Sequence, residues 1–226
     1  MNSHTPNPAH DPRSLPNDLP VPRDDGACLH LPRARLPSIE LPTSNGRVID
    51  LANLSGGDPL NPRPRAGAPR GTVIFCYPRT GVPGQPPSLG FQDETWESIP
   101  GARGCTPQSC GFRDLHAEFT SLGVTVLGLS TNTTDHQREF KDRSQIPFEF
   151  LSDHELKLTH ALRLPSFEFP VESGGPTTLL KRMAWYVEPD RDGAPRISKV
   201  WYPVFPPDKN AVTVLNWLRR RAEVVV

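Results

Sequence analysis

The chain has 226 residues, a length that fits one domain with a full hydrophobic core and additional segments. Its 25 basic residues balance its 25 acidic residues, so the composition favours neither nucleic acid nor an anionic membrane surface as a partner. No apolar run approaches the ~20 residues of a membrane span, and the N-terminal region lacks the hydrophobic stretch of a secretory signal, so we expect a cytoplasmic protein.

The N-terminal segment, residues 1–37, is rich in proline and shows no sustained apolar period. Such a composition predicts an irregular arm that wraps around the remainder of the chain. We expect that remainder, residues 38–226, to form one domain with an insertion at about residues 85–104.

The domain is expected to begin with a small β-hairpin made of residues 39–41 and 48–51. An Asn-Gly pair lies between the two strands, and this pair suits the positive φ angles of a tight turn. A linker rich in proline, arginine and glycine follows at residues 59–69. The apolar, β-branched run at residues 72–77 is typical of a central strand that is buried on both faces.

Regular alternation of helices and strands is predicted from residue 106 onward. A helix over residues 106–121 has Phe112 and Phe119 on its apolar face, and a strand over residues 124–130 completes a βαβ unit. The further expected elements are a helix over 134–143, a strand over 148–151, a helix capped by Asp153 that runs to 162, strands over 183–187 and 197–202, and a helix over 208–220. This order predicts the α/β class and a thioredoxin-like fold, with a central mixed sheet flanked by helices and an N-terminal proline-rich extension and hairpin.

Cys105 and Cys110 stand close together at the expected start of the first helix, in the run GCTPQSC. Thr106 is predicted to be the N-cap and Pro107 the first helical residue. The Cys105 sulfur would then lie near the positive end of the helix dipole, which favours a thiolate. Four cysteines are too few for a disulfide scaffold, so we interpret the close pair as a redox site.

Other interpretations of the cysteines remain open at this point. Cys105 and Cys110 could be small buried hydrophobes. A zinc site would need four ligands, and neither a second close cysteine pair nor a suitably spaced histidine pair accompanies them, so we expect no metal and no other cofactor. Cys76 lies inside an apolar strand and is interpreted as a core residue, whereas Cys28 is interpreted as an incidental thiol of the arm.

Reduction of a hydroperoxide is a reaction that these residue types can perform. It needs an ionised thiol, donors that hold the peroxide oxygens, and a second thiol that removes the sulfenic acid before further oxidation. Arg182 precedes one of the expected strands and would supply a permanent positive charge with a planar fork of donors. On a continuous helix the Cα atoms of Cys105 and Cys110 lie roughly 8–9 Å apart, beyond the ~7 Å limit for a disulfide, so the first turn would have to unwind.

Several separated stretches of the sequence resemble the peroxiredoxins, especially the bacterioferritin-comigratory or PrxQ type. These stretches are residues 73–78, 104–114, 124–130 and 147–153, together with Lys181-Arg182. The resemblance implies a thioredoxin fold, Cys105 as the peroxidatic cysteine, Cys110 as the resolving cysteine in a Cys105–Cys110 disulfide, and Arg182 as the active-site arginine. It also implies thioredoxin or a similar dithiol as the reductant.

The sequence departs from the family pattern before Cys105. In the family a proline, three residues, a threonine or serine and two more residues lead directly to the peroxidatic cysteine, and the hydroxyl contacts the peroxide. Here Pro78 begins the pattern, Val82 occupies the hydroxyl position, and the insertion follows. Pro78 and Thr80 are therefore the candidate substrate-binding residues, with Thr80 reaching the site if the loop folds back. Trp96 of the insertion is interpreted as ordinary packing, and a lid over the pocket is the alternative.

The sequence therefore predicts a thiol-dependent peroxidase that reduces hydrogen peroxide and organic hydroperoxides, as a monomer or dimer. A general thiol-disulfide oxidoreductase is one alternative, although such enzymes typically have Cys-x-x-Cys spacing. A redox-responsive binding module, in which the cysteine pair switches the proline-rich arm, is the other.

Overall fold

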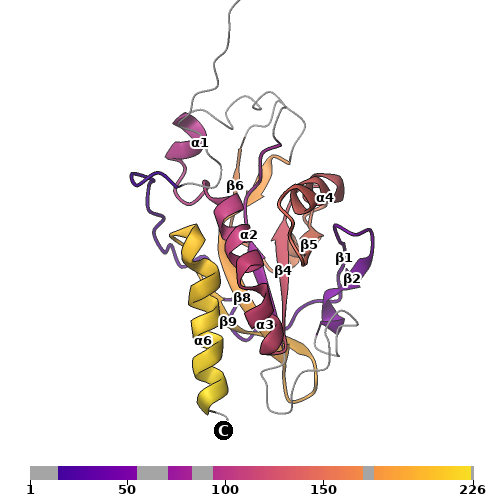
Figure 1. Cartoon of the computed structure of the whole chain (residues 1–226). Helices are drawn as coiled ribbons and strands as arrows, with labels where there is room; N and C mark the ends of the chain where they lie inside the picture. Colours follow the sequence, from indigo (N-terminus) through magenta and orange to yellow (C-terminus); the bar gives the residue numbers. More distant parts are fainter. Residues whose placement is uncertain (1–14, 55–70, 83–93, 170–175, 225–226) are drawn as a thin grey trace, which may run out of the picture.

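The computed structural model describes residues 15–54, 71–82, 94–169 and 176–224 (Figure 1). The expected linker, the first 14 residues of the arm and the first part of the insertion lie outside these ranges. In chain order the elements are β1 (Glu40–Pro42), β2 (Val48–Asp50), the 3-10 helix η1 (Leu51–Asn53), β3 (Gly71–Cys76), α1 (Glu94–Ser98), α2 (Cys105–Asp114), α3 (His116–Ser121), β4 (Val124–Ser130), α4 (Thr134–Arg143), β5 (Glu149–Ser152), α5 (Lys157–Ala161), β6 (Ser166–Glu168), β7 (Thr178–Leu180), β8 (Met183–Pro189), β9 (Pro195–Trp201), the 3-10 helix η2 (Pro207–Lys209) and α6 (Asn210–Val224).

The centre of the molecule is a five-stranded mixed sheet in the order β5-β4-β3-β8-β9. β3, β4 and β5 run parallel, and β8 pairs antiparallel with both β3 and β9. β3 is buried on both faces because its side chains alternate between two cores: Val73 and Phe75 belong to one, and Ile74 and Cys76 to the other. The strand that leads toward the cysteine helix is therefore held rigidly in the middle of the sheet.

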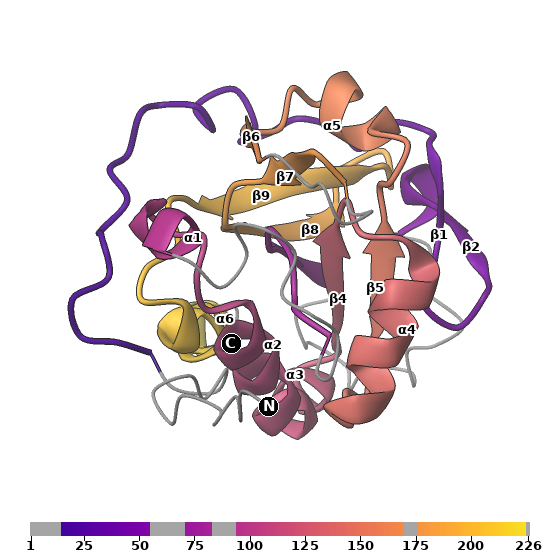
Figure 2. The same cartoon turned by 90° about the horizontal axis from the view of Figure 1, so that it is seen from above.

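Helices α2, α3, α4 and α6 cover one face of the sheet (Figure 2). Their core is rich in phenylalanine, and the stacked rings of Phe75 and Phe112, 4.4 Å apart, fix α2 on β3. Gly128 of β4 leaves room for this packing, since a Cβ there would lie 2.2 Å from the Phe150 ring. The cysteine helix is thus anchored to the sheet by aromatic contacts.

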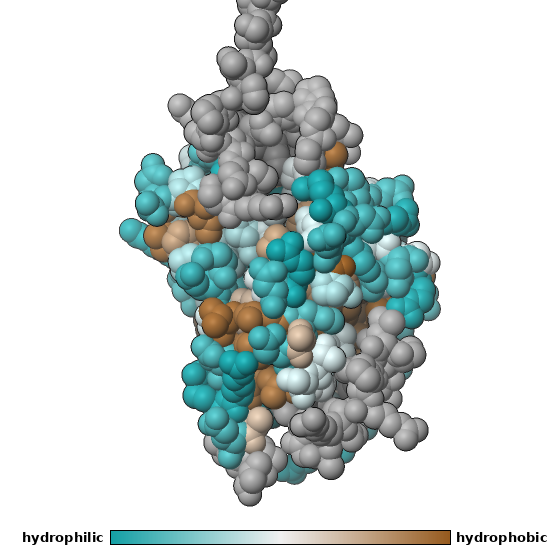
Figure 3. Space-filling model, viewed as in Figure 1, coloured by the Kyte–Doolittle hydropathy of each residue, from teal (hydrophilic) through white to brown (hydrophobic). Residues whose placement is uncertain are grey.

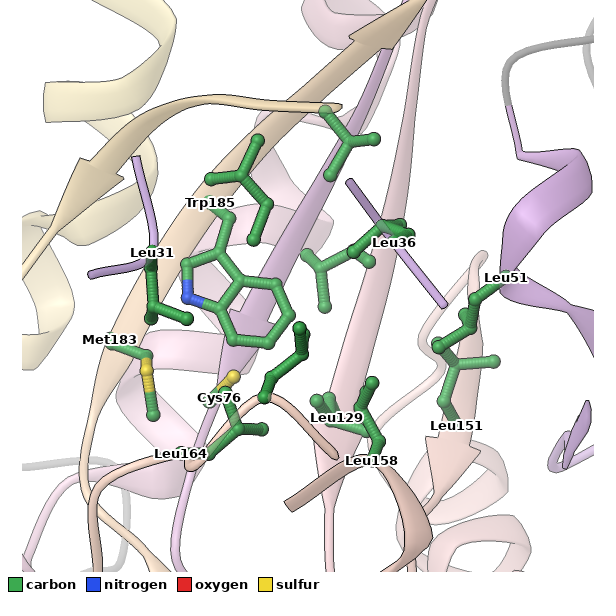
Figure 4. Close-up of a cluster of buried hydrophobic side chains, with 14 of the residues drawn as sticks. Leu31, Leu36, Leu51, Cys76, Leu129, Leu151, Leu158, Leu164, Met183 and Trp185 are labelled. Atoms are coloured by element: carbon green, nitrogen blue, oxygen red, sulfur yellow. The ribbon is translucent and has the colours of Figure 1, made fainter. Parts of the chain in front are cut away.

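The opposite face is covered by the arm, the β1-β2 hairpin and α5. Leucines of the arm, of β1, of η1 and of α5 share one buried cluster with Trp185 of β8, which is fully buried (Figure 4). In the view of Figure 1, polar residues form most of the described surface and apolar residues gather only in small groups (Figure 3).

N-terminal segments cover both edges of the sheet. At β9, the arm exchanges backbone hydrogen bonds with the strand, from Arg33 N to Ile197 O (2.7 Å) and from Ile197 N to Ala34 O (2.9 Å). At β5, Ser44 N donates to Phe150 O (2.9 Å). Backbone N–H and C=O groups at an uncovered sheet edge can pair with another chain. The arm and the hairpin occupy some of these groups on β9 and β5.

The structure confirms the predicted fold class, and most of the predicted elements lie within a few residues of the observed ones. Asp153 was predicted to cap the helix that ends near residue 162. The N-cap of α5 is Leu156, and Asp153, three residues earlier, still accepts from Leu158 N (3.0 Å) and Thr159 N (2.7 Å) in the first turn.

Three expectations need correction. The helix expected over residues 106–121 is two helices, because Leu115 leaves the helical conformation at φ −103° and ψ 13°. The β6-β7 pair was not expected from the sequence. Cys28 is not an incidental thiol of a loose arm: it is buried in the core, and its Sγ lies 3.8 Å from Met183 Sδ.

Candidate active site

Cys105 is the first residue of α2, and the glycine before it sets the start of the helix. Gly104 has a φ of 105°, in the left-handed region that glycine tolerates, and a Cβ there would lie 2.3 Å from Pro207 Cγ. The prediction that Thr106 is the N-cap is wrong, because the chain turns into the helix already at Gly104. Pro107 becomes the third helical residue, where its missing N–H is still one of the groups without an intrahelical acceptor. The Cys105 sulfur therefore stands at the positive end of α2.

Arg182 directs its guanidinium at the segment around Cys105. Its Nη2 donates to Cys105 Sγ at 3.3 Å, and also to Ala102 O (2.9 Å) and Arg103 O (3.2 Å). Nε donates to Gly101 O (3.2 Å), and Nη1 donates to the Gln108 side-chain oxygen. Arg182 is 3% exposed and Cys105 is 5% exposed, so the interaction is shielded from water. The Cys105 thiol also donates to Ala102 O at 3.7 Å, so the sulfur lies between a guanidinium donor and a backbone acceptor.

Arg182 reaches this position because it lies between β7 and β8. Lys181 N donates to Pro165 O (2.8 Å), and Val204 N donates to Arg182 O (3.2 Å). The backbone of Lys181 and Arg182 is therefore held by hydrogen bonds to loops at one end of the sheet. The expected strand order also placed Arg182 at this end.

Cys28 and Cys76 differ from Cys105 in their surroundings. Burial, with a contribution from the negative charge of Asp25, raises the pKa of Cys28 to about 12. Burial also raises the pKa of Cys76 well above its ordinary value. Both thiols therefore stay protonated at neutral pH, which agrees with the interpretation of Cys76 as a core residue.

Cys110 lies on the same continuous helix as Cys105 and is half-buried. None of the four cysteines is part of a disulfide. As long as residues 105–110 stay helical the two sulfurs cannot meet, because helix geometry separates their Cα atoms by roughly 8–9 Å. The structure therefore represents a dithiol arrangement, from which a disulfide would require α2 to unwind.

Pro78 and Thr80, the predicted substrate-binding residues, lie just after β3 and are both buried. The Thr80 hydroxyl lies 3.1 Å from His136 Nε2, and the same nitrogen donates to the Thr80 carbonyl oxygen (2.8 Å). Burial lowers the pKa of His136, which favours the neutral ring in this contact. The hydroxyl proposed for substrate is therefore engaged with α4, and the substrate role of Pro78 and Thr80 stays a prediction.

The described part of the insertion packs beside the site. Trp96 of α1 is 4% exposed, and its ring lies 5.2 Å from that of Phe169 in a small apolar cluster that also contains Leu179. This burial agrees with the interpretation of Trp96 as an ordinary packing residue. An ion pair between Arg103 and Glu97 connects α1 to the segment that Arg182 binds.

Among the residues that the structure describes, no group of three or more His, Cys, Asp or Glu side chains is placed to hold a metal ion. Within the same ranges, no helix combines the length and the apolarity needed to cross a bilayer.

Residues that sequence reasoning did not single out complete the site. Gln108 joins Arg182 to Asn210, whose Oδ1 accepts from Gln108 Nε2 at 2.9 Å, and His136 holds Thr80. Gln108 is three residues after Cys105, so helical spacing alone places it on a neighbouring position of the same face. No comparable signal in the sequence relates Asn210 or His136 to the site.

The fold and the site define a thioredoxin-fold protein with a buried thiol–guanidinium pair at a helix N-terminus. Comparisons with solved structures agree: the peroxidoxin BcpB of Mycobacterium tuberculosis superposes with a TM-score of 0.59 at 21% identity, covering 84% of this chain and 98% of that one. Peroxiredoxin Q of Xanthomonas campestris gives a TM-score of 0.54 at 21% identity, covering 81% and 91%. At these identities the likeness concerns the fold.

Residues 98–189 match the model of the AhpC/TSA family, and relatives of this chain include Bcp and Q-type peroxiredoxins. Peroxiredoxin bcp1 of Schizosaccharomyces pombe is 32% identical over 118 residues, 52% of this chain and 44% of that protein. Peroxiredoxin Bcp of Bacillus subtilis is 25% identical over 127 residues, 56% of this chain and 60% of that protein. The chain thus spans about half the length of these curated relatives.

Proposed function

We propose that the protein is a thiol-dependent peroxidase that reduces hydrogen peroxide and organic hydroperoxides. The observation that carries this proposal is the 3.3 Å hydrogen bond from Arg182 to the sulfur of Cys105, at the first residue of α2. The guanidinium and the helix end both favour a thiolate and can stabilise negative charge on a departing oxygen.

In the proposed cycle the Cys105 thiolate attacks one peroxide oxygen and the O–O bond breaks. The sulfur becomes a sulfenic acid, and the departing alkoxide or hydroxide takes a proton from solvent to leave as alcohol or water. The Cys110 thiol then attacks the Cys105 sulfur, so that a Cys105–Cys110 disulfide forms and water leaves. A dithiol such as thioredoxin returns both cysteines to thiols and is itself oxidised to a disulfide.

Peroxide consumption by the purified protein with dithiothreitol tests this function. The wild type should consume hydrogen peroxide catalytically, and Cys105→Ser should not. Cys76→Ser is the matched control, since its buried thiol should not contribute. A wild-type protein that reduces insulin disulfides but leaves peroxide untouched would support the general oxidoreductase instead.

The proposed substrate contact of Thr80 can be tested separately. If its hydroxyl leaves His136 to bind peroxide, Thr80→Val should slow peroxide reduction, whereas Thr80→Ser should keep it. Equal rates for both variants would remove Thr80 from the site and leave the Cys105 chemistry unaffected.

A further inference from the structure

A chain of buried side chains continues from Arg182 away from Cys105. Arg182 Nη1 donates to the Gln108 side-chain oxygen, and Gln108 Nε2 donates to Asn210 Oδ1 at 2.9 Å. Gln108 is fully buried and Asn210 is 3% exposed. Asn210 is the first residue of α6, whose N-terminal end and η2 lie beside α2 (Figure 1).

The chemistry of the groups fixes the direction of this chain. A guanidinium has only donors, so the Gln108 oxygen must face Arg182 and the Gln108 NH₂ must face Asn210. The oxygen of Asn210 is then the acceptor that holds the Gln108 amide in this orientation. Without that acceptor, the buried Gln108 amide could turn its donors toward Arg182, where they would oppose the guanidinium.

We propose that Asn210 is a positioning residue for peroxide reduction, acting through Gln108 on the guanidinium of Arg182. The inference rests on the proposed peroxidase function. Arg182 Nη2 serves three acceptors, Ala102 O, Arg103 O and Cys105 Sγ, and the sulfur is the most distant of them. Gln108 holds Nη1, which fixes the plane of the guanidinium and keeps Nη2 directed at the sulfur.

The same contact has an opposite effect on the second step of the cycle. Gln108 lies between Cys105 and Cys110, in the part of α2 that must unwind before the two sulfurs can meet. The bond from Gln108 to Asn210 is lost in the unwound form and therefore favours the helical one. Asn210 should accelerate attack on peroxide and retard disulfide formation.

Two rate constants, measured by stopped-flow with hydrogen peroxide, test the proposal: oxidation of Cys105 and formation of the Cys105–Cys110 disulfide. Asn210→Ala should lower the first by about 10-fold, the lower end of what loss of an orienting partner costs, and should raise the second. Asn210→Asp keeps the acceptor and should stay near the wild-type values. If Asn210→Ala does not fold, Asn210→Leu removes the acceptor at similar volume.

Val214→Ala is the matched control, because Val214 is a fully buried residue one turn further along α6 and outside the hydrogen-bonded chain. Its rate of Cys105 oxidation should equal that of the wild type even if α6 is destabilised. An unchanged oxidation rate in Asn210→Ala, or equal slowing in Val214→Ala or Asn210→Asp, would overturn the role of Asn210. Failure of the proposed function would be distinct, since the wild type itself would then leave peroxide unreduced.

Discussion

Arg182 uses all three nitrogens of its guanidinium on the segment around Cys105. It binds the backbone carbonyls of residues 101–103, the Gln108 side chain and the Cys105 sulfur. One side chain thus shapes the approach to the cysteine and supplies the positive charge beside it. This double use explains why a permanently charged planar group occupies a position that is nearly inaccessible to water.

Replacing Arg182 by Lys keeps the charge and removes the planar fork. We expect the second-order rate constant for peroxide reduction to fall by ~10²–10³, the usual cost of one preorganised donor. Arg113→Lys, at the other end of α2 and paired with Asp114, is the control and should keep the rate. A near-normal rate in Arg182→Lys would mean that the positive charge at Cys105 comes from another residue.

The four thiols should differ in reactivity toward iodoacetamide near pH 7. Cys105 should react first, while Cys28 and Cys76 should stay unmodified in the folded protein because burial raises the pKa of both. Mass spectrometry of peptides at short reaction times measures the order. A fast thiol that survives in Cys105→Ser and disappears in Cys110→Ser would reverse the proposed roles of the two cysteines.

At the scale of single elements, α2 combines opposing requirements. Its first turn is helical where Cys105 meets Arg182, and the proposed Cys105–Cys110 disulfide would require the same turn to unwind. The stacked Phe75 and Phe112 rings hold the later part of the helix on the sheet. The conformational change is therefore expected to be confined to the part of α2 before Phe112.

Mild oxidation with peroxide should give an intramolecular Cys105–Cys110 disulfide with a partial loss of helical circular dichroism. Reduction should restore the signal. Peptide mapping identifies the bond. The idea fails if mapping finds only intermolecular bonds, or a bond from Cys105 to Cys76 or Cys28.

Gly104 is the second feature of this element that can be tested. Gly104→Ala should destabilise the protein by about 1–3 kcal/mol from backbone strain, with a further cost because the new Cβ meets Pro207. Gly46→Ala is the matched control, since Gly46 also has a positive φ (86°) but no atom within 4 Å of the added Cβ. Chemical denaturation compares the two. Equal losses of stability would show that contact with η2 contributes nothing.

At the scale of the whole molecule, the described part of the arm, residues 15–37, is part of the folded structure. It pairs with the edge strand β9, contributes Cys28 and Leu31 to the core, and is held to the end of the sheet beside the site by Asp25. Asp25 accepts from Lys181 Nζ (2.7 Å) and from the Tyr202 hydroxyl (2.8 Å). These two hydrogen bonds lower the pKa of Asp25 from 3.8 to about 2.

The lowered pKa predicts how this contact depends on pH. The ionised Asp25 is favoured by folding, so its contribution to stability is complete above pH 3.8 and is lost as the pH falls to about 2. Asp25→Asn should lower the free energy of unfolding at pH 6 by at most ~1 kcal/mol, because the pair is solvent-exposed. The difference from wild type should shrink as the pH falls through about 2.

Urea denaturation at both pH values measures this difference. Asp18 is an exposed aspartate of the same arm, so Asp18→Asn is the control. Its free energy of unfolding should differ from that of the wild type by the same amount at both pH values. A difference between Asp25→Asn and wild type that is as large at pH 2 as at pH 6 would contradict the ionic contact.

The local pattern of residues determined the elements. The apolar run of β3, the helical spacing of Phe112 and Phe119, and the Asn-Gly turn of the hairpin act over a few neighbouring residues. The strand and the hairpin formed where they were predicted, and the predicted helix formed as two helices, α2 and α3. The order of these elements limited the topology to a mixed sheet with covering helices, and the cysteine run placed Cys105 at a helix start. The positive φ of Gly104 is also a local property of the chain, although the sequence pattern pointed to Thr106 as the N-cap.

Contacts between distant segments were decided only by the tertiary structure. Gln108 and Asn210 are 102 residues apart, Thr80 and His136 are 56 apart, and Asp25 and Lys181 are 156 apart. Residue type and spacing show that such polar groups need partners when they are buried, but not which partners they find. That choice depends on how the sheet, α2 and α6 pack, because only the packing brings an amide of one helix within hydrogen-bond distance of the arginine and asparagine that flank it.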